Sequence, residues 1–172
     1  MEGTKVEYRL AMLKDLDLIV NSTDKYSRKE LSEILASKGF VCIATTIEGK
    51  GTLTRNKVVG ILSVTFPHRS EKNLGRFFSD DENILEKVAL FDVISLPTSV
   101  QGIEHVLPGI LKQAENIVNT TRYPIFVVRL NYDNDKEKLM DSLVKKRLYD
   151  DKRVRGNDLL YKKRFNPFMT CD

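Results

Sequence analysis

The sequence has little cysteine and no long apolar segment. Its two cysteines, Cys42 and Cys171, are far apart in the chain, so their spacing indicates neither a metal site nor a redox pair, and we expect two free thiols. No stretch reaches the roughly 18 consecutive apolar residues that a membrane-spanning helix needs. Residues 1–5 also lack the apolar stretch of a secretory signal. These features predict an intracellular protein, cytoplasmic or nuclear, without a membrane partner.

Internal repeats, low-complexity tracts and linkers rich in Pro, Gly or Ser are missing as well. The length of 172 residues is typical of one domain, and a hydrophobic content of 41% is that of ordinary globular proteins rather than disordered ones. We therefore expect a single folded domain over residues 1–172.

Charge gives a weak indication of partners. The net charge of +4 mildly favours anionic molecules, and basic residues gather at 145–147, 152–155 and 162–164. Such clusters suit either solvated helix and strand faces or a nucleic-acid surface. Few aromatic residues lie among them, so the pattern favours solvated faces, and nucleic acid is the less favoured partner.

Patterning in the first half of the chain predicts a strand, two helices and a hairpin. Residues 6–10 alternate like a strand, and residues 15–20 have helical spacing. Ser27 and Glu30 form a capping box that begins a helix, and Gly39 ends it. Residues 40–47 and 58–66 are rich in β-branched side chains and read as a β-hairpin. The polar segment 67–86 reads as a loop or short helix that could cover an acceptor site or dock a protein or peptide partner. An exposed Phe77–Phe78 pair would favour a partner, and a buried pair would belong to the core.

The second half predicts a crossover between buried strands. Residues 88–96 and 125–130 are apolar runs, and a helix-length segment with one apolar face lies between them, so the two strands should be parallel neighbours. Leu139, Leu143 and Leu148 indicate a further helix, and residues 158–165 a final strand. The predicted fold class is α/β, a mixed central sheet flanked by helices in the order β-α-α-β-β-β-α-β-α-β.

This order resembles the GNAT superfamily of N-acetyltransferases over residues 5–165. Local features agree with the resemblance: residues 8–17 are similar to the first strand of that family running into an acidic helix start, and residues 57–61 to its third strand. Residues 131–134, Asn-Tyr-Asp-Asn, resemble the asparagines that often follow its fifth strand. The resemblance implies acetyl-coenzyme A as cofactor.

The resemblance also implies where that cofactor would bind. In the family a loop patterned Gln/Arg-x-x-Gly-x-Gly/Ala presents backbone amides at a helix N-terminus to the pyrophosphate. Residues 99–104 are the best match and keep only the middle glycine, with Glu104 in the last position. The implied cofactor contacts are Ile94, Leu96, Gln101, Gly102, Ile103, Asn131 and Asn134.

Two departures from the pattern bear on phosphate binding. Glu104 could cap the amides in place of a phosphate, or it could point outward while Lys112 or Arg122 holds the nucleotide. Pro108 either marks a later helix start or removes a backbone hydrogen bond.

Catalytic residues are implied at two positions. Asp92 matches the family's carboxylate base near the fourth strand, although it could equally pair with a basic side chain. Tyr149 is the tyrosine available as acid for the leaving thiolate, or else a packed aromatic. The implied function is acetyl transfer to an amine of a protein, peptide or small molecule. The alternative is an inactive GNAT-like domain that serves as a protein-binding or assembly module.

Overall fold

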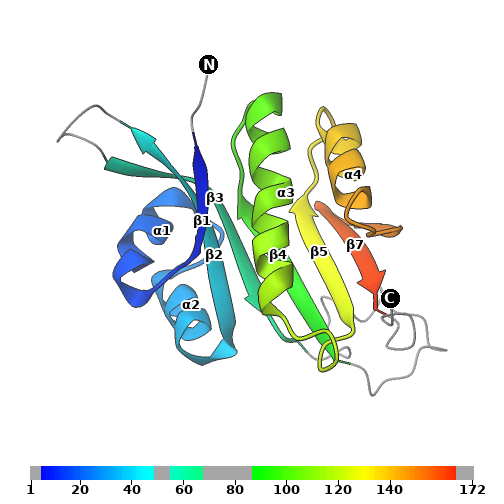
Figure 1. Ribbon diagram of the computed structural model, residues 1–172, viewed down its shortest axis with the longest axis horizontal. Coiled ribbons are helices and arrows are strands. Elements are labelled where there is room, and N and C mark those ends of the chain that lie inside the picture. The colour runs from blue at the N-terminus through cyan, green and yellow to red at the C-terminus, as the bar shows by residue number, and fades with distance from the viewer. Residues whose placement is uncertain (1–4, 49–54, 68–86, 166–172) are drawn as a thin grey trace.

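The computed structural model describes residues 5–48, 55–67 and 87–165, and their strands form one seven-stranded sheet in the order β1-β2-β3-β4-β5-β7-β6 (Figure 1). The strands are β1 (Val6–Leu10), β2 (Gly39–Glu48), β3 (Arg55–Thr65), β4 (Val88–Ser95), β5 (Ile125–Asn131), β6 (Asp151–Arg155) and β7 (Asp158–Arg164). The α-helices are α1 (Leu16–Ser22), α2 (Arg28–Glu33), α3 (Val100–Ile117) and α4 (Glu137–Lys145). A 3₁₀ turn, η1 (Leu13–Asp15), precedes α1, and a π turn, η2 (Ile34–Lys38), extends α2.

The predicted α/β class and element order are confirmed, with one strand more than we predicted. The β2–β3 hairpin and the parallel pairing of β4 with β5 also match the prediction. The additional strand, β6, pairs with β7 at the edge of the sheet and has mostly charged residues, so it lacks the apolar alternation by which strands are recognised. Leu148 was wrongly placed on a helix: it follows α4, is exposed, and has a positive φ of 72°.

Apolar clusters lie on both faces of the sheet. Buried residues of α3 and α4, such as Ile110, Leu111 and Val144, pack with Phe91 and Phe126 on one face. The other face carries a smaller cluster in which Ile19 and Leu31, from α1 and α2, contact β2, β3 and β4. Figure 1 shows α3 crossing the sheet in front of β4, with α4 beside it. On the α1–α2 side, β4, β5 and β7 form a further small cluster without any helix residue, made of Val88, Leu90, Ile125, Val127 and Leu160. The central strands β4 and β5 thus have buried apolar side chains on both faces.

Two local contacts fix the entry into the first helices. Ser27 Oγ accepts a hydrogen bond from the Glu30 N–H at 3.2 Å, and the Glu30 carboxylate accepts one from the Ser27 N–H at 2.7 Å, so the predicted capping box is present. Arg9 donates two hydrogen bonds of 2.8 Å to the buried carboxylate of Asp15, which also accepts from the Met12 N–H at 2.8 Å. This second contact ties β1 to the start of α1.

The replacement of Asp15 by asparagine is expected to destabilise the fold in a pH-dependent way. The hydrogen bonds from Arg9 lower the pKa of Asp15 from 3.8 to about 2, against the opposing effect of burial. Because the folded-state pKa lies below the unfolded one, the stabilisation is complete above pH 4 and is lost as the pH falls towards 2. The urea midpoints of wild type and Asp15→Asn should differ at pH 6 and converge near pH 2. A constant difference would contradict the assignment.

Several expectations fall on residues whose structure is not described. Phe77, Phe78 and most of the 67–86 segment belong to them, as does Cys171. Cys42 is buried, and burial raises the pKa of its thiol to about 12. Among the described helices, none combines the length and hydropathy needed to cross a bilayer.

Candidate functional site

The two central parallel strands separate at their carboxyl ends. Their pairing runs from Val88 opposite Ile125 to Asp92 opposite Arg129 and stops there, although both strands continue. Beyond that point β4 remains paired with β3, and β5 with β7. The facing edges of β4 and β5 therefore have backbone groups that no ladder hydrogen bond between the two strands uses.

A β-bulge in β4 lies at this separation. Val93 is opposite Leu62 and Ser95 is opposite Ile61, so Ile94 is the extra residue on the bulged strand. The side chain of Ile94 packs with the cluster beneath α1 and α2, away from α3. Ile94 thus faces the gap between the strands with its backbone rather than with its side chain.

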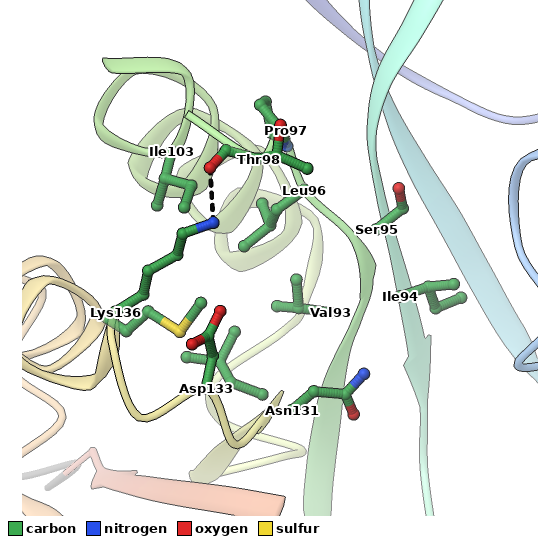
Figure 2. Close-up of a pocket in the computed structure, with 12 residues that line it drawn as sticks. Val93, Ile94, Ser95, Leu96, Pro97, Thr98, Ile103, Asn131, Asp133 and Lys136 are labelled. Atoms are coloured by element: carbon green, nitrogen blue, oxygen red, sulfur yellow. Dashed lines mark hydrogen bonds between the residues drawn. The ribbon is translucent and has the colours of Figure 1, made fainter. Parts of the chain in front are cut away.

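A cleft of about 190 Å³ fills the gap on the α3–α4 side. Val93, Leu96, Ile103, Leu130 and Met140 give it apolar walls. Figure 2 shows Val93, Leu96 and Ile103 together with polar groups around the cleft. The remaining lining residues are Ile94, Ser95, Pro97, Thr98, Asn131, Asp133 and Lys136.

A lysine spans the cleft. Lys136, the residue before α4, donates from Nζ to the carbonyl oxygen of Thr98 at 2.5 Å, next to the N-terminus of α3 (Figure 2). We call this contact the Lys136–Thr98 bridge. It joins the loop after β4 to the loop after β5 and places a cation beside the first turn of α3.

The N-terminus of α3 is capped by Ser99. Its Oγ accepts a hydrogen bond from the Gly102 N–H at 3.0 Å, and its carbonyl accepts one from Ile103 at 3.0 Å. The N–H groups of Val100 and Gln101 have no hydrogen-bond partner among the described residues. A Cβ on Gly102 would lie 2.5 Å from Pro97 Cβ, so glycine is required here by packing within the loop.

These contacts decide between the alternatives that the sequence left open for Glu104 and Pro108. Glu104 is not the cap, because Ser99 has that role and Glu104 lies past the first turn, exposed. The helix does not start late: Pro108 is inside it, and so the Glu104 carbonyl loses its usual donor. Arg122 follows the far end of α3, and Lys112 is about 18 Å along the helix from its start, so neither reaches the N-terminal amides.

The predicted cofactor contacts divide into three groups. Ile94, Leu96, Ile103 and Asn131 line the cleft. Gln101 and Gly102 instead line a separate cavity of about 680 Å³ on the other side of the α3 N-terminus, against β1 and β3. Asn134 is exposed and accepts a hydrogen bond from the Tyr132 hydroxyl at 3.3 Å, outside both cavities.

Asp92 is at the centre of a buried ionic cluster on the α1–α2 face. Its carboxylate, 1% exposed, accepts from Arg129 Nε and Nη2 at 3.1 and 2.8 Å and from Lys25 Nζ at 2.8 Å. Tyr26 donates its hydroxyl to the same carboxylate. We call these four residues the Asp92 cluster. Asp92 and Arg129 are the last paired residues of β4 and β5 before the strands separate.

The electrostatics of the Asp92 cluster disfavour a base. Burial would raise the pKa of Asp92, but the hydrogen bonds and charges of Arg129 and Lys25 outweigh it, so the pKa lies below its ordinary value. Burial, reinforced by the Asp92 charge, raises the pKa of Tyr26 to about 12. A carboxylate that is already paired with two cations binds a proton weakly. The geometry thus matches the ion-pairing alternative for Asp92.

Tyr149 is distant from the cleft. It is fully buried, and Lys163 Nζ lies 4.5 Å from its ring centroid. Lys163 pairs with Phe126 at the opposite end of β5 from the strand gap, and it donates to Glu115. Burial raises the pKa of Tyr149 well above 10. The structure therefore presents Tyr149 as a packed aromatic and does not bring it to the leaving group.

Sequence reasoning missed Lys136, Asp133 and Thr98 in the cleft, and Lys25, Tyr26 and Arg129 around Asp92. The role of Ser99 as N-cap was missed as well, and it is the one role with a local sequence signal, since serine is a preferred residue at a helix N-cap. The other contacts join residues that are 37 or more positions apart, so no local pattern marks them.

Some features of the cleft suit acetyl-coenzyme A, and one does not. Its apolar walls and the unpaired strand edges suit a chain of methylenes and amides, which could hydrogen-bond to the open edges. Lys136 and the free N–H groups of Val100 and Gln101 suit a phosphate. The Gly102 N–H, however, is already used by Ser99.

The chain matches no protein-family profile and no curated protein sequence. Its fold is similar to solved structures at low identity. Arabidopsis thaliana NAA60 in complex with a bisubstrate analogue has a TM-score of 0.59 and 10% identity, covering 94% of this chain and all of that one. The NatC complex bound to Gag peptide and CoA gives 0.58 and 11%, covering 92% and 96%. A GNAT-family acetyltransferase from Streptococcus pneumoniae gives 0.54 and 14%, covering 94% and 100%.

These likenesses extend over almost the whole of each chain, and they agree with the resemblance that the sequence indicated. In this chain the strands β4 and β5 separate, β4 has a bulge at Ile94, and α3 begins just after β4. The chain therefore has the fold of the GNAT N-acetyltransferases.

Proposed function

We propose that this protein transfers an acetyl group from acetyl-coenzyme A to an amine, through the gap between β4 and β5. The observation that carries the proposal is the end of strand pairing at Asp92 and Arg129, followed by the bulge at Ile94. Together they leave a gap between β4 and β5 that connects the α3–α4 face of the sheet with its α1–α2 face. The solved neighbours include Arabidopsis thaliana NAA60 in complex with acetyl-CoA, which supports this use of the fold.

The reaction needs the two substrates on opposite sides of the gap. The cleft beside α3 would take the thioester, and an amine would approach from the α1–α2 face. The amine nitrogen forms a bond to the thioester carbonyl carbon, the carbon–sulfur bond breaks, and the sulfur leaves with the electron pair and gains the proton that the amine releases. We infer that backbone N–H groups of β4 beyond Asp92, where pairing with β5 has ended, stabilise charge on the carbonyl oxygen.

The main contribution of the protein to this reaction is to align the amine with the thioester. Asp92, with its lowered pKa, is a poor base, and Tyr149 is elsewhere. We therefore infer that the amine enters neutral or loses its proton to water, and that orientation across the gap supplies most of the rate. The acceptor is an amine of a protein, a peptide or a small molecule.

A second candidate is a binding module that has lost catalysis. Two observations favour it: the Lys136–Thr98 bridge spans the cleft, and Ser99 occupies the Gly102 N–H. In that case the cleft would stay closed, and the protein would act through a protein partner.

Titration with acetyl-coenzyme A separates the two candidates. At a concentration of about one hundred times its dissociation constant, a ligand that binds only the folded state stabilises it by about 2.7 kcal/mol. We expect a clear rise of the thermal midpoint with acetyl-coenzyme A and a smaller rise with adenosine alone. An unchanged thermal midpoint at millimolar acetyl-coenzyme A would contradict acetyl transfer and favour the binding module.

Replacement of Ser99 by glycine is expected to tighten acetyl-coenzyme A binding by about tenfold. It releases the Gly102 N–H, and a hydrogen bond from a backbone donor to a charged phosphate is worth about 1.5 kcal/mol or more. Glycine is a tolerated N-cap, so the unliganded protein should lose only a few tenths of a kcal/mol. Calorimetric titration measures the change.

The matched control is Ser27→Gly, which removes the cap of α2. It should cost similar stability and leave the affinity for acetyl-coenzyme A unchanged. An equal affinity of Ser99→Gly and wild type would show that the phosphate does not approach α3.

A further inference from the structure

A third cavity, with a mostly polar lining, lies on the α1–α2 face of the sheet, beside the Asp92 cluster. It measures about 380 Å³ and is formed by the end of β5 and the β6–β7 hairpin. Its lining residues are Arg129, Arg155, Gly156, Asn157, Asp158 and Leu160. This volume is enough for a small polar molecule or for one end of a larger one.

The register of the strands puts both arginines on one face. Arg129 alternates with Val128 and Leu130, which pack under α3 and α4, so Arg129 points to the other side. Leu160 is directly opposite Arg129, and Asp158, two residues before it on β7, is opposite Arg155. Directly paired residues share a face, so the two guanidinium groups border the same space.

The hairpin turn is fixed next to the strand gap. Gly156 has a φ of 58°, which favours glycine in a two-residue turn, and the carbonyl of Asn157 accepts a hydrogen bond from the Tyr132 N–H at 2.6 Å. Tyr132 follows β5 directly. The cavity therefore lies where an amine would approach the gap from the α1–α2 face.

Arg155 has unused donors in this cavity. Its Nη1 is buried and has no hydrogen-bond partner among the residues that the structure describes, and those residues also offer it no ion pair within 4 Å. Arg129 gives Nε and Nη2 to Asp92, and none of the described side chains accepts from its Nη1, whose hydrogens can serve another acceptor. A buried guanidinium donor without an acceptor is costly, so the arrangement favours a ligand that supplies one.

The ligand chemistry follows from these donors. We propose that the cavity between Arg129 and Arg155 binds the anionic oxygen group, carboxylate or phosphate, of the amine that is acetylated. Arginine forks hold such groups through paired, charge-assisted hydrogen bonds. Asp158 adds one carboxylate to the two guanidinium groups, which suits an acceptor that carries an amine as well as an anion. The role as acceptor site rests on the proposed acetyl transfer, whereas the anion binding does not.

The test uses two pairs of amines that differ in one group: β-alanine with β-alaninamide, and phosphoethanolamine with ethanolamine. Binding is measured by calorimetry or NMR titration on the full chain without acetyl-coenzyme A. The wild type should bind the anionic member of at least one pair about tenfold more tightly than the neutral member. The pair that shows the preference identifies carboxylate or phosphate.

Variants assign the preference to the cavity. Arg155→Gln should abolish it, and Arg155→Lys, which keeps the charge without the fork, should retain part of it. Arg153→Gln is the matched control: Arg153 is on the same strand and face but is 61% exposed and 3.7 Å from Asp151, so the preference should survive. Equal binding of both members of both pairs, or a preference that survives Arg155→Gln, overturns the proposal.

A turnover assay with the same four amines keeps this result separate from the proposed function. If the anionic preference is present in binding but no amine is acetylated, acetyl transfer fails and the anion site stands. If amines are acetylated without any preference for the anionic members, acetyl transfer stands and the anion site fails.

Discussion

Replacement of Asp92 by asparagine is expected to lower the free energy of unfolding by about 3–5 kcal/mol, the usual effect of removing one member of a buried ion pair. The amide leaves the charges of Arg129 and Lys25, whose side chains are 16% and 25% exposed, without a counter-charge. It also replaces one of the two carboxylate oxygens with an NH2 donor, so Tyr26, Arg129 and Lys25 can no longer all keep their acceptors. Chemical denaturation at pH 7 measures the loss.

The control is Asp151→Asn on β6. Asp151 is 43% exposed, and its carboxylate is 3.6 and 3.7 Å from Lys162 and Arg153, so its loss should cost less than about 1 kcal/mol. If Asp92 were instead a catalytic base, its replacement would reduce activity rather than stability. If Asp92→Asn keeps its stability and loses acetyl transfer, the Asp92 cluster is not the main role of this carboxylate, and Asp92 acts in the chemistry.

The fold was predictable because its signals are local. The capping box at Ser27 depends on two side chains three residues apart, and the parallel β4–β5 pair depends on two apolar runs with a helix-length segment between them. The order of such segments permits few topologies. The errors lie where local signals are weak: β6 has the composition of a charged loop, and Leu148 continues a helical spacing after α4 has ended.

The site was only partly predictable, for a different physical reason. Ile94, Leu96, Ile103 and Asn131 were found because the position of a residue along a strand or helix decides whether it reaches the gap. The environment of Asp92 depends on side chains 37, 66 and 67 positions away, so its pKa was not readable from the sequence. For the same reason the cation in the cleft was missed.

That cation supports a second large expected effect. Replacement of Lys136 by methionine should weaken acetyl-coenzyme A binding by at least tenfold, because it removes a charge that the Lys136–Thr98 bridge holds beside the free N–H groups of Val100 and Gln101. A hydrogen bond between charged groups contributes about 1.5–3 kcal/mol, which corresponds to roughly a tenfold to hundredfold change in affinity. Calorimetric titration at low and high salt measures it, and the salt dependence should decrease in the variant.

Lys138→Met is the matched control, since Lys138 is an exposed lysine of α4 that does not line the cleft. Its affinity for acetyl-coenzyme A should equal that of the wild type. The opposite sign at Lys136 would be equally informative: if Lys136→Met binds acetyl-coenzyme A more tightly, the Lys136–Thr98 bridge closes the cleft against the cofactor. The binding module would then be the better account of the protein, because a cleft held shut by its own lysine must be opened before the thioester can reach the strand gap.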